Sequence, residues 1–179
     1  MPKFPRLLLD ANIIIFAHEL RIWSQLTENC TITITRIIAE REAQFWPDQQ
    51  GKAHKIRLNE YVQKGKINRV NVPPAQFDAF RQIFGPTYLD RMDTGEAELL
   101  AFLYHSQKKW LICSADGIVF KTLGCLGLAE QGISLEEILQ QIELTCELDE
   151  QHKQYTKVYR LKLTEMGQQE GNSGMAFKL

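Results

Sequence analysis

Short apolar runs alternate with amphipathic stretches along this chain of 179 residues. Residues 7–9 and 110–113 are apolar throughout, without the polar alternation of a half-solvated strand. Such runs are typical of strands buried on both faces, as in parallel sheets covered by helices. Residues 30–35 alternate and are rich in β-branched side chains, and residues 67–72 end at two prolines, so both segments are also predicted strands.

Between these strands, apolar positions recur every three or four residues, which predicts helices. The predicted helices span residues 13–26, 36–46, 75–84, 92–103, 117–126, 134–147 and 149–165. A polar and basic segment at 49–61 fits either a helix or a loop. Strands alternating with helices predict an α/β fold, a three-layer α/β/α sandwich around a mainly parallel sheet.

The length predicts one domain with a short appendage. We place the domain at residues 1–147 and a C-terminal extension at residues 148–179. The extension begins with a mixed-charge, partly apolar stretch and is expected to be helical there. Its glycine-rich, polar end, residues 168–179, is expected to be flexible.

The amino-acid composition excludes only a few classes of function. Hydrophobic residues make up 44% and charged residues 24% of the chain, as in ordinary globular proteins. A net charge of −1 neither requires nor excludes a nucleic-acid partner, because a basic face can lie opposite an acidic pocket. The four cysteines lack the spacing of a zinc or redox site. Neither a signal peptide nor a membrane-spanning run is evident, so we expect a cytoplasmic protein.

Acidic residues recur where strands end and helices begin. Asp10 follows the first strand, Glu40 lies in the helix after the second, Asp93 and Glu96 open a later helix, and Asp116 follows a late strand. Strand ends and helix starts converge at one edge of a parallel sheet. Like charges that close raise one another's pKa unless a cation neutralises them. Oxygen ligands without histidine or cysteine favour Mg²⁺ or Mn²⁺ over zinc.

Each acid also has a purely structural interpretation. Asp93 and Glu96 match a capping box, and Asp10 and Asp116 are good helix caps. Glu40 could pair with a neighbour on an exposed helix face. Capping explains each position alone, but four such positions together favour a shared site.

Four short motifs resemble the acidic motifs of PIN domains: Leu8-Leu9-Asp10-Ala11-Asn12, Ile37-Ile38-Ala39-Glu40, Asp93-Thr94-Gly95-Glu96-Ala97-Glu98 and Ile112-Cys113-Ser114-Ala115-Asp116. Together they cover most of the chain in the family's order. The resemblance implies a PIN-like fold, metal-dependent ribonuclease activity, and kinship with the toxins of bacterial toxin–antitoxin pairs. The partners it implies are RNA, a small antitoxin protein and a second copy of the chain.

The same resemblance assigns roles to single residues. Asp10, Glu40 and Asp116 match three family acids. A further family acid is usually an aspartate that opens a helix. Glu96 stands at the matching position here, and Asp93 precedes it by one turn. The resemblance therefore implies four catalytic acids, Asp10, Glu40, Glu96 and Asp116. It also implies that Asp10, Glu96, Asp116 and Asp93 are candidate ligands to Mg²⁺ or Mn²⁺, and either or both acids of the capping box could reach the metal.

Two small polar residues, Asn12 and Ser114, match positions beside the family acids and would orient ligands or water. Binding RNA also requires cations, because phosphate contacts dominate nucleic-acid affinity. The best basic region contains Lys52, Lys55 and Arg57.

Two other functions stay open at this point. A haloacid-dehalogenase-like phosphatase also places an aspartate after its first strand, but it needs a second acid where Asn12 stands. A catalytically inactive PIN-like domain that binds RNA or a protein partner ranks ahead of it, because the match at the helix-opening acid departs from the family pattern.

Overall fold

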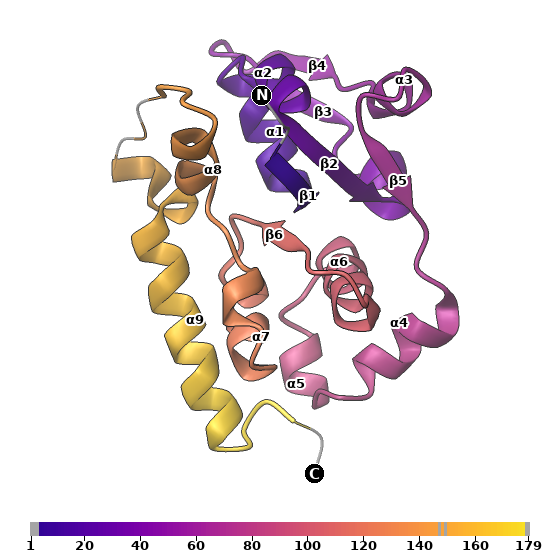
Figure 1. Ribbon diagram of the computed structural model, residues 1–179, viewed down its shortest axis with the longest axis vertical. Helices are drawn as coiled ribbons and strands as arrows, with labels where there is room; N and C mark the ends of the chain where they lie inside the picture. Colours follow the sequence, from indigo (N-terminus) through magenta and orange to yellow (C-terminus); the bar gives the residue numbers. More distant parts are fainter. Residues whose placement is uncertain (1–3, 147, 149, 178–179) are drawn as a thin grey trace.

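The computed structural model describes residues 4–146, 148 and 150–177 (Figure 1). Four strands form one sheet: β1 (Phe4–Leu9), β2 (Cys30–Thr35), β5 (Asn68–Val70) and β6 (Leu111–Cys113). Their order is β5-β2-β1-β6, and every neighbouring pair is parallel. The predicted α/β class with a parallel sheet is therefore confirmed. β1 is central, with Leu7 opposite Ile32 of β2 on one side and Leu111 of β6 on the other.

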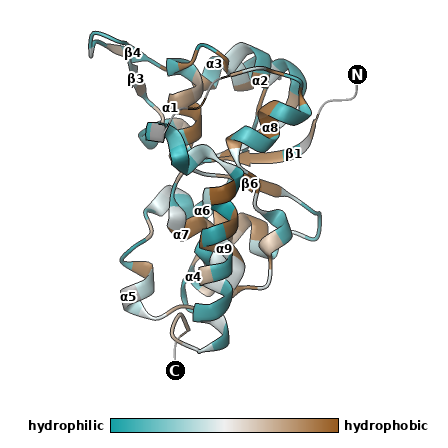
Figure 2. Cartoon of the chain, turned by 90° about the vertical axis from the view of Figure 1, so that its left-hand side faces the viewer, coloured by the Kyte–Doolittle hydropathy of each residue, from teal (hydrophilic) through white to brown (hydrophobic). Residues whose placement is uncertain are grey.

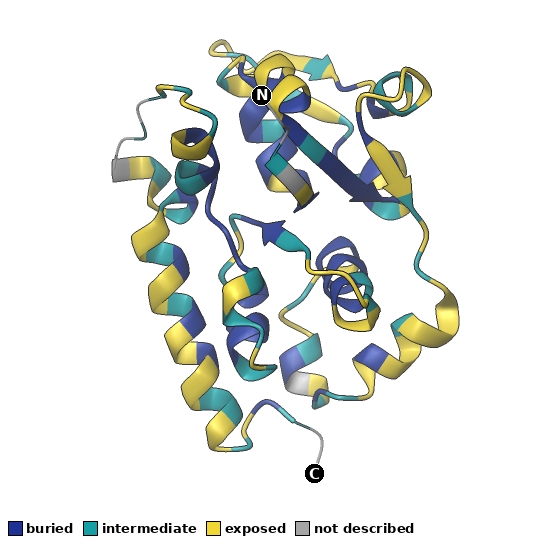
Figure 3. Cartoon of the chain, viewed as in Figure 1, coloured by how far each residue is buried: buried dark blue, intermediate teal, exposed yellow. Residues whose placement is uncertain are grey.

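Helices lie on both faces of this sheet, as a three-layer arrangement requires. α1 (Ala11–Glu19) and α2 (Trp23–Asn29) lie on one side, and α6 (Thr94–His105) and α7 (Gly117–Cys125) on the other (Figure 2). The central strands are buried accordingly (Figure 3). Shorter helical elements complete the domain: η1 (Ile38–Glu42), α3 (Leu58–Gln63), α4 (Pro74–Arg81), α5 (Pro86–Leu89), η2 (Ala129–Gln131) and α8 (Leu135–Gln141).

Three predicted helices of the domain are wrong in extent. The helix expected at 134–147 ends at Gln141 as α8, and Glu143 shortly after it has a left-handed backbone (φ 55°). The helix expected at 13–26 is divided into α1 and α2, with Arg21 in the left-handed conformation (φ 59°) at the break. The helix expected at 36–46 ends at Glu42, because the chain then turns into an antiparallel hairpin, β3 (Phe45–Pro47) and β4 (Ala53–Lys55). This hairpin projects from the body of the molecule (Figure 2).

The C-terminal extension packs along the domain. After η3 (Glu150–Tyr155), helix α9 (Lys157–Asn172) runs beside α7 (Figure 1). It begins later than predicted and continues into the stretch expected to be flexible, and Ala176 beyond it is buried. The predicted boundary lies between residues 147 and 148, the predicted helix of the extension starts at residue 149, and the predicted flexible stretch ends at residue 179. Residues 147, 149, 178 and 179 lie outside the described residues. None of the described helices combines the length and apolarity needed to cross a bilayer.

Candidate functional site

Asp10 occupies the junction between β1 and α1, at the carboxyl edge of the sheet. Its backbone N–H still pairs with the carbonyl of Cys113, while its side chain accepts a hydrogen bond from the Ala11 N–H (2.6 Å) and caps α1. Only 1% of the residue is exposed. Burial, together with the charges of Asp93 and Asp116, raises the pKa of Asp10 to about 6, although a hydrogen bond from Ser114 opposes the shift.

Ser114 links Asp10 to the second acid of this edge. Its hydroxyl donates to Asp10 Oδ2 (2.8 Å) and accepts from the backbone N–H of Asp116 (3.0 Å). Asp116 in turn caps α7 by accepting from the Ile118 N–H (2.9 Å), and its side chain is exposed. Two sequence-distant acids are thus joined through one buried hydroxyl, at the end of β6 next to the end of β1.

The capping box predicted at the start of α6 is present. Asp93 Oδ1 accepts from the Glu96 N–H (2.8 Å), and Glu96 Oε2 accepts from the Asp93 N–H (3.0 Å). Capping does not account for the rest of Glu96, which is 2% exposed and whose Oε1 has no hydrogen-bond partner among the described residues. Burial, followed by the charges of Asp116 and Asp10, raises the pKa of Glu96 well above its ordinary value.

Glu42, which the sequence prediction did not include, is the acid that η1 brings to the site. Glu42 Oε1 accepts from the Gly95 N–H (3.0 Å), and its buried Oε2 has no hydrogen-bond partner in the described part of the chain. Burial and the charges of Asp93, Asp10 and Glu98 raise the pKa of Glu42 to about 7, while the bond from Gly95 opposes this shift.

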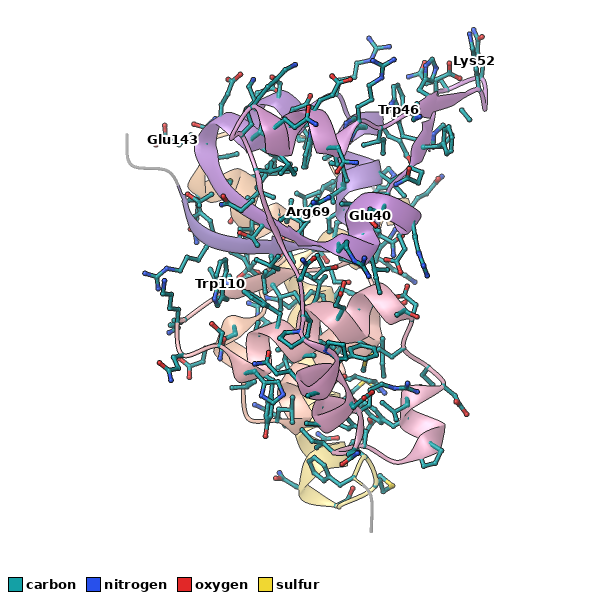
Figure 4. The ribbon with its side chains drawn as sticks, turned by 90° about the vertical axis from the view of Figure 1, so that its right-hand side faces the viewer. Glu40, Trp46, Lys52, Arg69, Trp110 and Glu143 are labelled. Atoms are coloured by element: carbon teal, nitrogen blue, oxygen red, sulfur yellow. The ribbon has the colours of Figure 1, made fainter. Side chains whose placement is uncertain are left out.

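Glu40, the acid predicted from η1, does not join the cluster. Its exposed side chain forms an ion pair with Arg69 (3.4 Å; Figure 4). The reason lies in the helical turn, because Ile38 and Ala39 face the core and a residue three or four positions later shares their face. That residue is Glu42. The apolar residues Ile38 and Ala39, four and three positions before Glu42, were the sequence feature that could have identified Glu42.

Gly95 lets Glu42 approach. A Cβ at this position would collide with the Glu42 carboxylate. The neighbouring acid on α6, Glu98, is buried and accepts a hydrogen bond from the Ile37 N–H (3.3 Å). It therefore holds the start of the segment that carries Glu42.

The remaining predicted residues form no hydrogen bond or ion pair with the acids of the cluster in the described part of the chain. Asn12 is exposed on α1, two positions after Asp10. Lys52 is exposed on the projecting hairpin (Figure 4), and so is Lys55. Arg57 pairs with Glu60 (3.1 Å) at the start of α3.

One more side chain reaches this edge from α9. The hydroxyl of Tyr159 lies 3.1 Å from the point where a Cβ on Gly117 would stand, directly after Asp116. Partial burial and the charge of Asp116 raise the pKa of Tyr159. The sequence offered no indication of this approach, because it depends on how α9 crosses α7.

Five carboxylates form a cluster at this edge and influence one another: Asp10, Glu42, Asp93, Glu96 and Asp116. Glu98 also acts on Glu42, but its carboxylate is hydrogen-bonded to the Ile37 N–H. Within the described residues, none of the five forms an ion pair with a lysine, arginine or histidine. The N-termini of α1, α6 and α7 supply partial positive charge, which offsets the repulsion only in part. Two buried oxygens without partners in a group of hard oxygen donors suit a divalent cation such as Mg²⁺ or Mn²⁺.

The cluster is not a closed ligand cage. Across the described ranges, no three histidine, cysteine, aspartate or glutamate side chains are already arranged as a metal site. No protein-family model and no curated protein matches the chain. The resemblance to PIN domains accordingly stays a prediction that rests on the motifs themselves.

Proposed function

We propose that this protein is a metal-dependent ribonuclease of the PIN-like kind, which hydrolyses RNA phosphodiester bonds at the five-carboxylate cluster. The observation that carries the proposal is the pair of buried carboxylate oxygens, Glu42 Oε2 and Glu96 Oε1, that lack a hydrogen-bond partner among the described residues. Buried charged groups ordinarily pair or bind a metal. Here they belong to a cluster without a cationic side chain.

The residues of the cluster would divide the work. Asp10, Glu96 and Asp116 are the proposed metal ligands, and Glu42 takes the role that the sequence assigned to Glu40. Asp93 stays a further candidate ligand beside Glu96. Bound Mg²⁺ or Mn²⁺ would supply a water of lowered pKa and positive charge for the leaving oxygen.

Two features of the chain itself would prepare this site. Ser114 holds Asp10 in one orientation through the 2.8 Å hydrogen bond, so that this carboxylate does not have to be ordered when metal binds. The cap bonds at Asp93 and Asp116 fix the starts of their helices. The cluster thus combines fixed carboxylates with the two oxygens that have no hydrogen bond of their own.

The surface that we propose for RNA binding is the β3–β4 hairpin. Phe45 is 55% exposed on it, and Trp46 stacks on His54 with 4.7 Å between ring centroids. Lys52 (Figure 4) and Lys55 add exposed cations. Aromatic faces interleaved with cations suit a flexible single strand, which can stack its bases and pair its phosphates.

The test is calorimetric titration of Mn²⁺ into the wild type and Asp10→Asn, combined with cleavage of a single-stranded RNA. Asp78→Asn, an exposed aspartate on α4, is the matched control. We expect the wild type and Asp78→Asn to bind Mn²⁺ and cleave RNA, and Asp10→Asn to lose both. A wild type that binds no Mn²⁺ would contradict the proposal.

A second function is favoured by the lack of a preformed ligand cage among the described residues. In that case the same fold binds RNA or a protein partner without cutting. RNA binding by the wild type that is indifferent to Mn²⁺ and unaccompanied by cleavage would support this function. The ribonuclease proposal includes a relationship to the toxins of toxin–antitoxin pairs, with a small antitoxin protein and a second copy of the chain as partners. Copurification of the protein with the product of an adjacent gene tests the antitoxin partner.

A further inference from the structure

Helix α9 is held against α7 at unusually short range. A Cβ on Gly124 of α7 would meet the backbone of Thr164, and a Cβ on Gly167 of α9 would meet the backbone of Lys121. Glycine at both positions therefore allows the two helix backbones to touch. Lys121 also pairs with Glu170 (2.5 Å) across the same contact. The position of α9 along α7 is consequently fixed by backbone contact and by charge.

The first turn of α9 is anchored separately. Thr156 caps the helix by accepting from the Tyr159 N–H (3.3 Å). The Lys157 N–H donates to Glu136 (2.7 Å), and Arg160 donates two hydrogen bonds of 2.8 Å to the carboxylate of Glu137. The residues on both sides of Tyr159 are therefore tied to the domain, which leaves its side chain little freedom to move away.

Tyr159 is directed at the site by this anchoring. Its hydroxyl stands 3.1 Å from the Cβ position of Gly117, the first residue of α7 and the neighbour of Asp116. The hydroxyl forms no hydrogen bond with another described residue, and the side chain is only partly buried. A polar group is thus available beside the cluster.

The chemistry of the cluster shows what such a group could contribute. Ionised carboxylates only accept hydrogen bonds, and RNA phosphate oxygens are acceptors too. A substrate strand at this edge therefore needs donors next to the acids. Tyrosine is a neutral donor that stays protonated at physiological pH.

We infer that Tyr159 is a substrate-positioning residue, which α9 adds to the acidic site and whose hydroxyl donates a hydrogen bond to a phosphate oxygen of the RNA strand beside Asp116. The inference rests on the proposed ribonuclease function. It gives the C-terminal extension a direct part in substrate binding.

The experiment compares the wild type, Tyr159→Phe and Tyr104→Phe in cleavage of a single-stranded RNA with Mn²⁺. Tyr104 is an exposed tyrosine in the last turn of α6, at the opposite end of that helix from Asp93. We expect Tyr159→Phe to raise KM about fivefold, the effect of one lost hydrogen bond, with kcat little changed. Its Mn²⁺ affinity and thermal midpoint should match the wild type. Tyr104→Phe should leave every quantity unchanged.

The other outcomes distinguish a failure of the inference from a failure of the proposed ribonuclease function. An active wild type together with an unchanged KM in Tyr159→Phe overturns the inference and leaves the proposed function standing. Loss of Mn²⁺ binding or a lower thermal midpoint in Tyr159→Phe also overturns it, since the hydroxyl would then serve structure. A wild type that neither binds Mn²⁺ nor cuts RNA overturns both.

Discussion

The backbone N–H of Gly95 donates a hydrogen bond to the carboxylate of Glu42 across 53 residues of sequence, at 3.0 Å. This bond joins the segment after β2 to the start of α6. It exists because residue 95 has no side chain, since a Cβ there would occupy the space of the carboxylate.

Gly95→Ala should therefore disable the site without unfolding the protein. Alanine favours the helix by at most about 1 kcal/mol, but its methyl group displaces Glu42. We expect Mn²⁺ affinity to fall at least tenfold while the thermal midpoint changes little. Gly85→Ala is the control, because the nearest atom to a Cβ there lies at an ordinary 3.7 Å. Equal Mn²⁺ affinity in Gly95→Ala and the wild type would contradict the prediction.

The two glutamates of η1 should behave oppositely. Glu42→Gln should abolish RNA cleavage, because it removes a carboxylate from the cluster. Glu40→Gln should remain active, because it disturbs only the exposed pair with Arg69, worth about 0–1 kcal/mol. Cleavage rates of the two variants, measured with the same RNA, decide the matter. If Glu40→Gln lost activity and Glu42→Gln did not, the original assignment of Glu40 as a catalytic acid would stand.

The stability of the metal-free protein should fall as pH rises. The pKa values of Asp10 (about 6) and Glu42 (about 7) in the folded state lie above their ordinary values near 4. Between about pH 4 and pH 7 the unfolded chain has therefore lost protons that the folded chain retains, so raising the pH favours unfolding. Glu96, shifted in the same direction, extends the decline to higher pH.

Thermal melts in EDTA at pH 5, 7 and 9 measure this decline. Glu96→Gln should flatten it, because the variant has no proton to lose at that position, and Mn²⁺ should raise the midpoint most at high pH. A thermal midpoint that rises from pH 5 to pH 9 without metal would contradict the burial of these carboxyl groups.

The ion pair between Arg160 and Glu137, which anchors α9 to the domain, should contribute strongly to the free energy of unfolding. Arg160 and Glu137 are paired with only 11% and 16% of their side chains exposed. Arg160→Met leaves Glu137 without its partner and should lower the free energy of unfolding by about 3 kcal/mol in urea titration. Lys109→Met, which breaks an exposed pair with Glu130, should cost less than about 1 kcal/mol. Equal costs in the two variants would mean that the buried pair contributes no more than a surface pair.

RNA affinity should depend on the hairpin. Neither Lys52 nor Lys55 has a carboxylate partner among the described side chains, so both ammonium groups can reach phosphate. Replacing both with alanine should weaken RNA binding and reduce the slope of log affinity against log salt by about one per lysine. Lys162→Ala, on the exposed face of α9, is the control. An unchanged slope would place the RNA elsewhere.

The sequence was sufficient to predict the features of the fold and of the site that local patterns determine. The all-apolar runs at β1 and β6 predicted buried parallel strands, and the acids at their ends do lie together. The capping box at Asp93 and Glu96 was readable because its two bonds join residues three apart. The caps do not exclude the predicted shared site, because a residue can cap a helix and still carry charge into the cluster.

Two of the three features that escaped prediction depend on distant parts of the chain, and the third is a local hairpin. Glu42 is identified by its bond to Gly95 rather than by its neighbours, and motif position favoured Glu40 instead. The hairpin after η1 was hidden in a polar segment without clear periodicity. Tyr159 reaches the site only because glycines allow α9 to touch α7. For Glu42 and Tyr159 the deciding contact joins residues that no short window contains, whereas the hairpin pairs residues only six to ten positions apart.

The bond between Ser114 and Asp10 spans 104 residues, and the pair of Lys121 and Glu170 spans 49. Such contacts require long loops to close before any of their stabilisation is gained, which slows folding. β1 gains its second neighbour only with β6, and α7 is covered only when α9 arrives. We therefore expect this chain to assemble its acidic edge late, after most of its sequence has collapsed, and to refold slowly for its size.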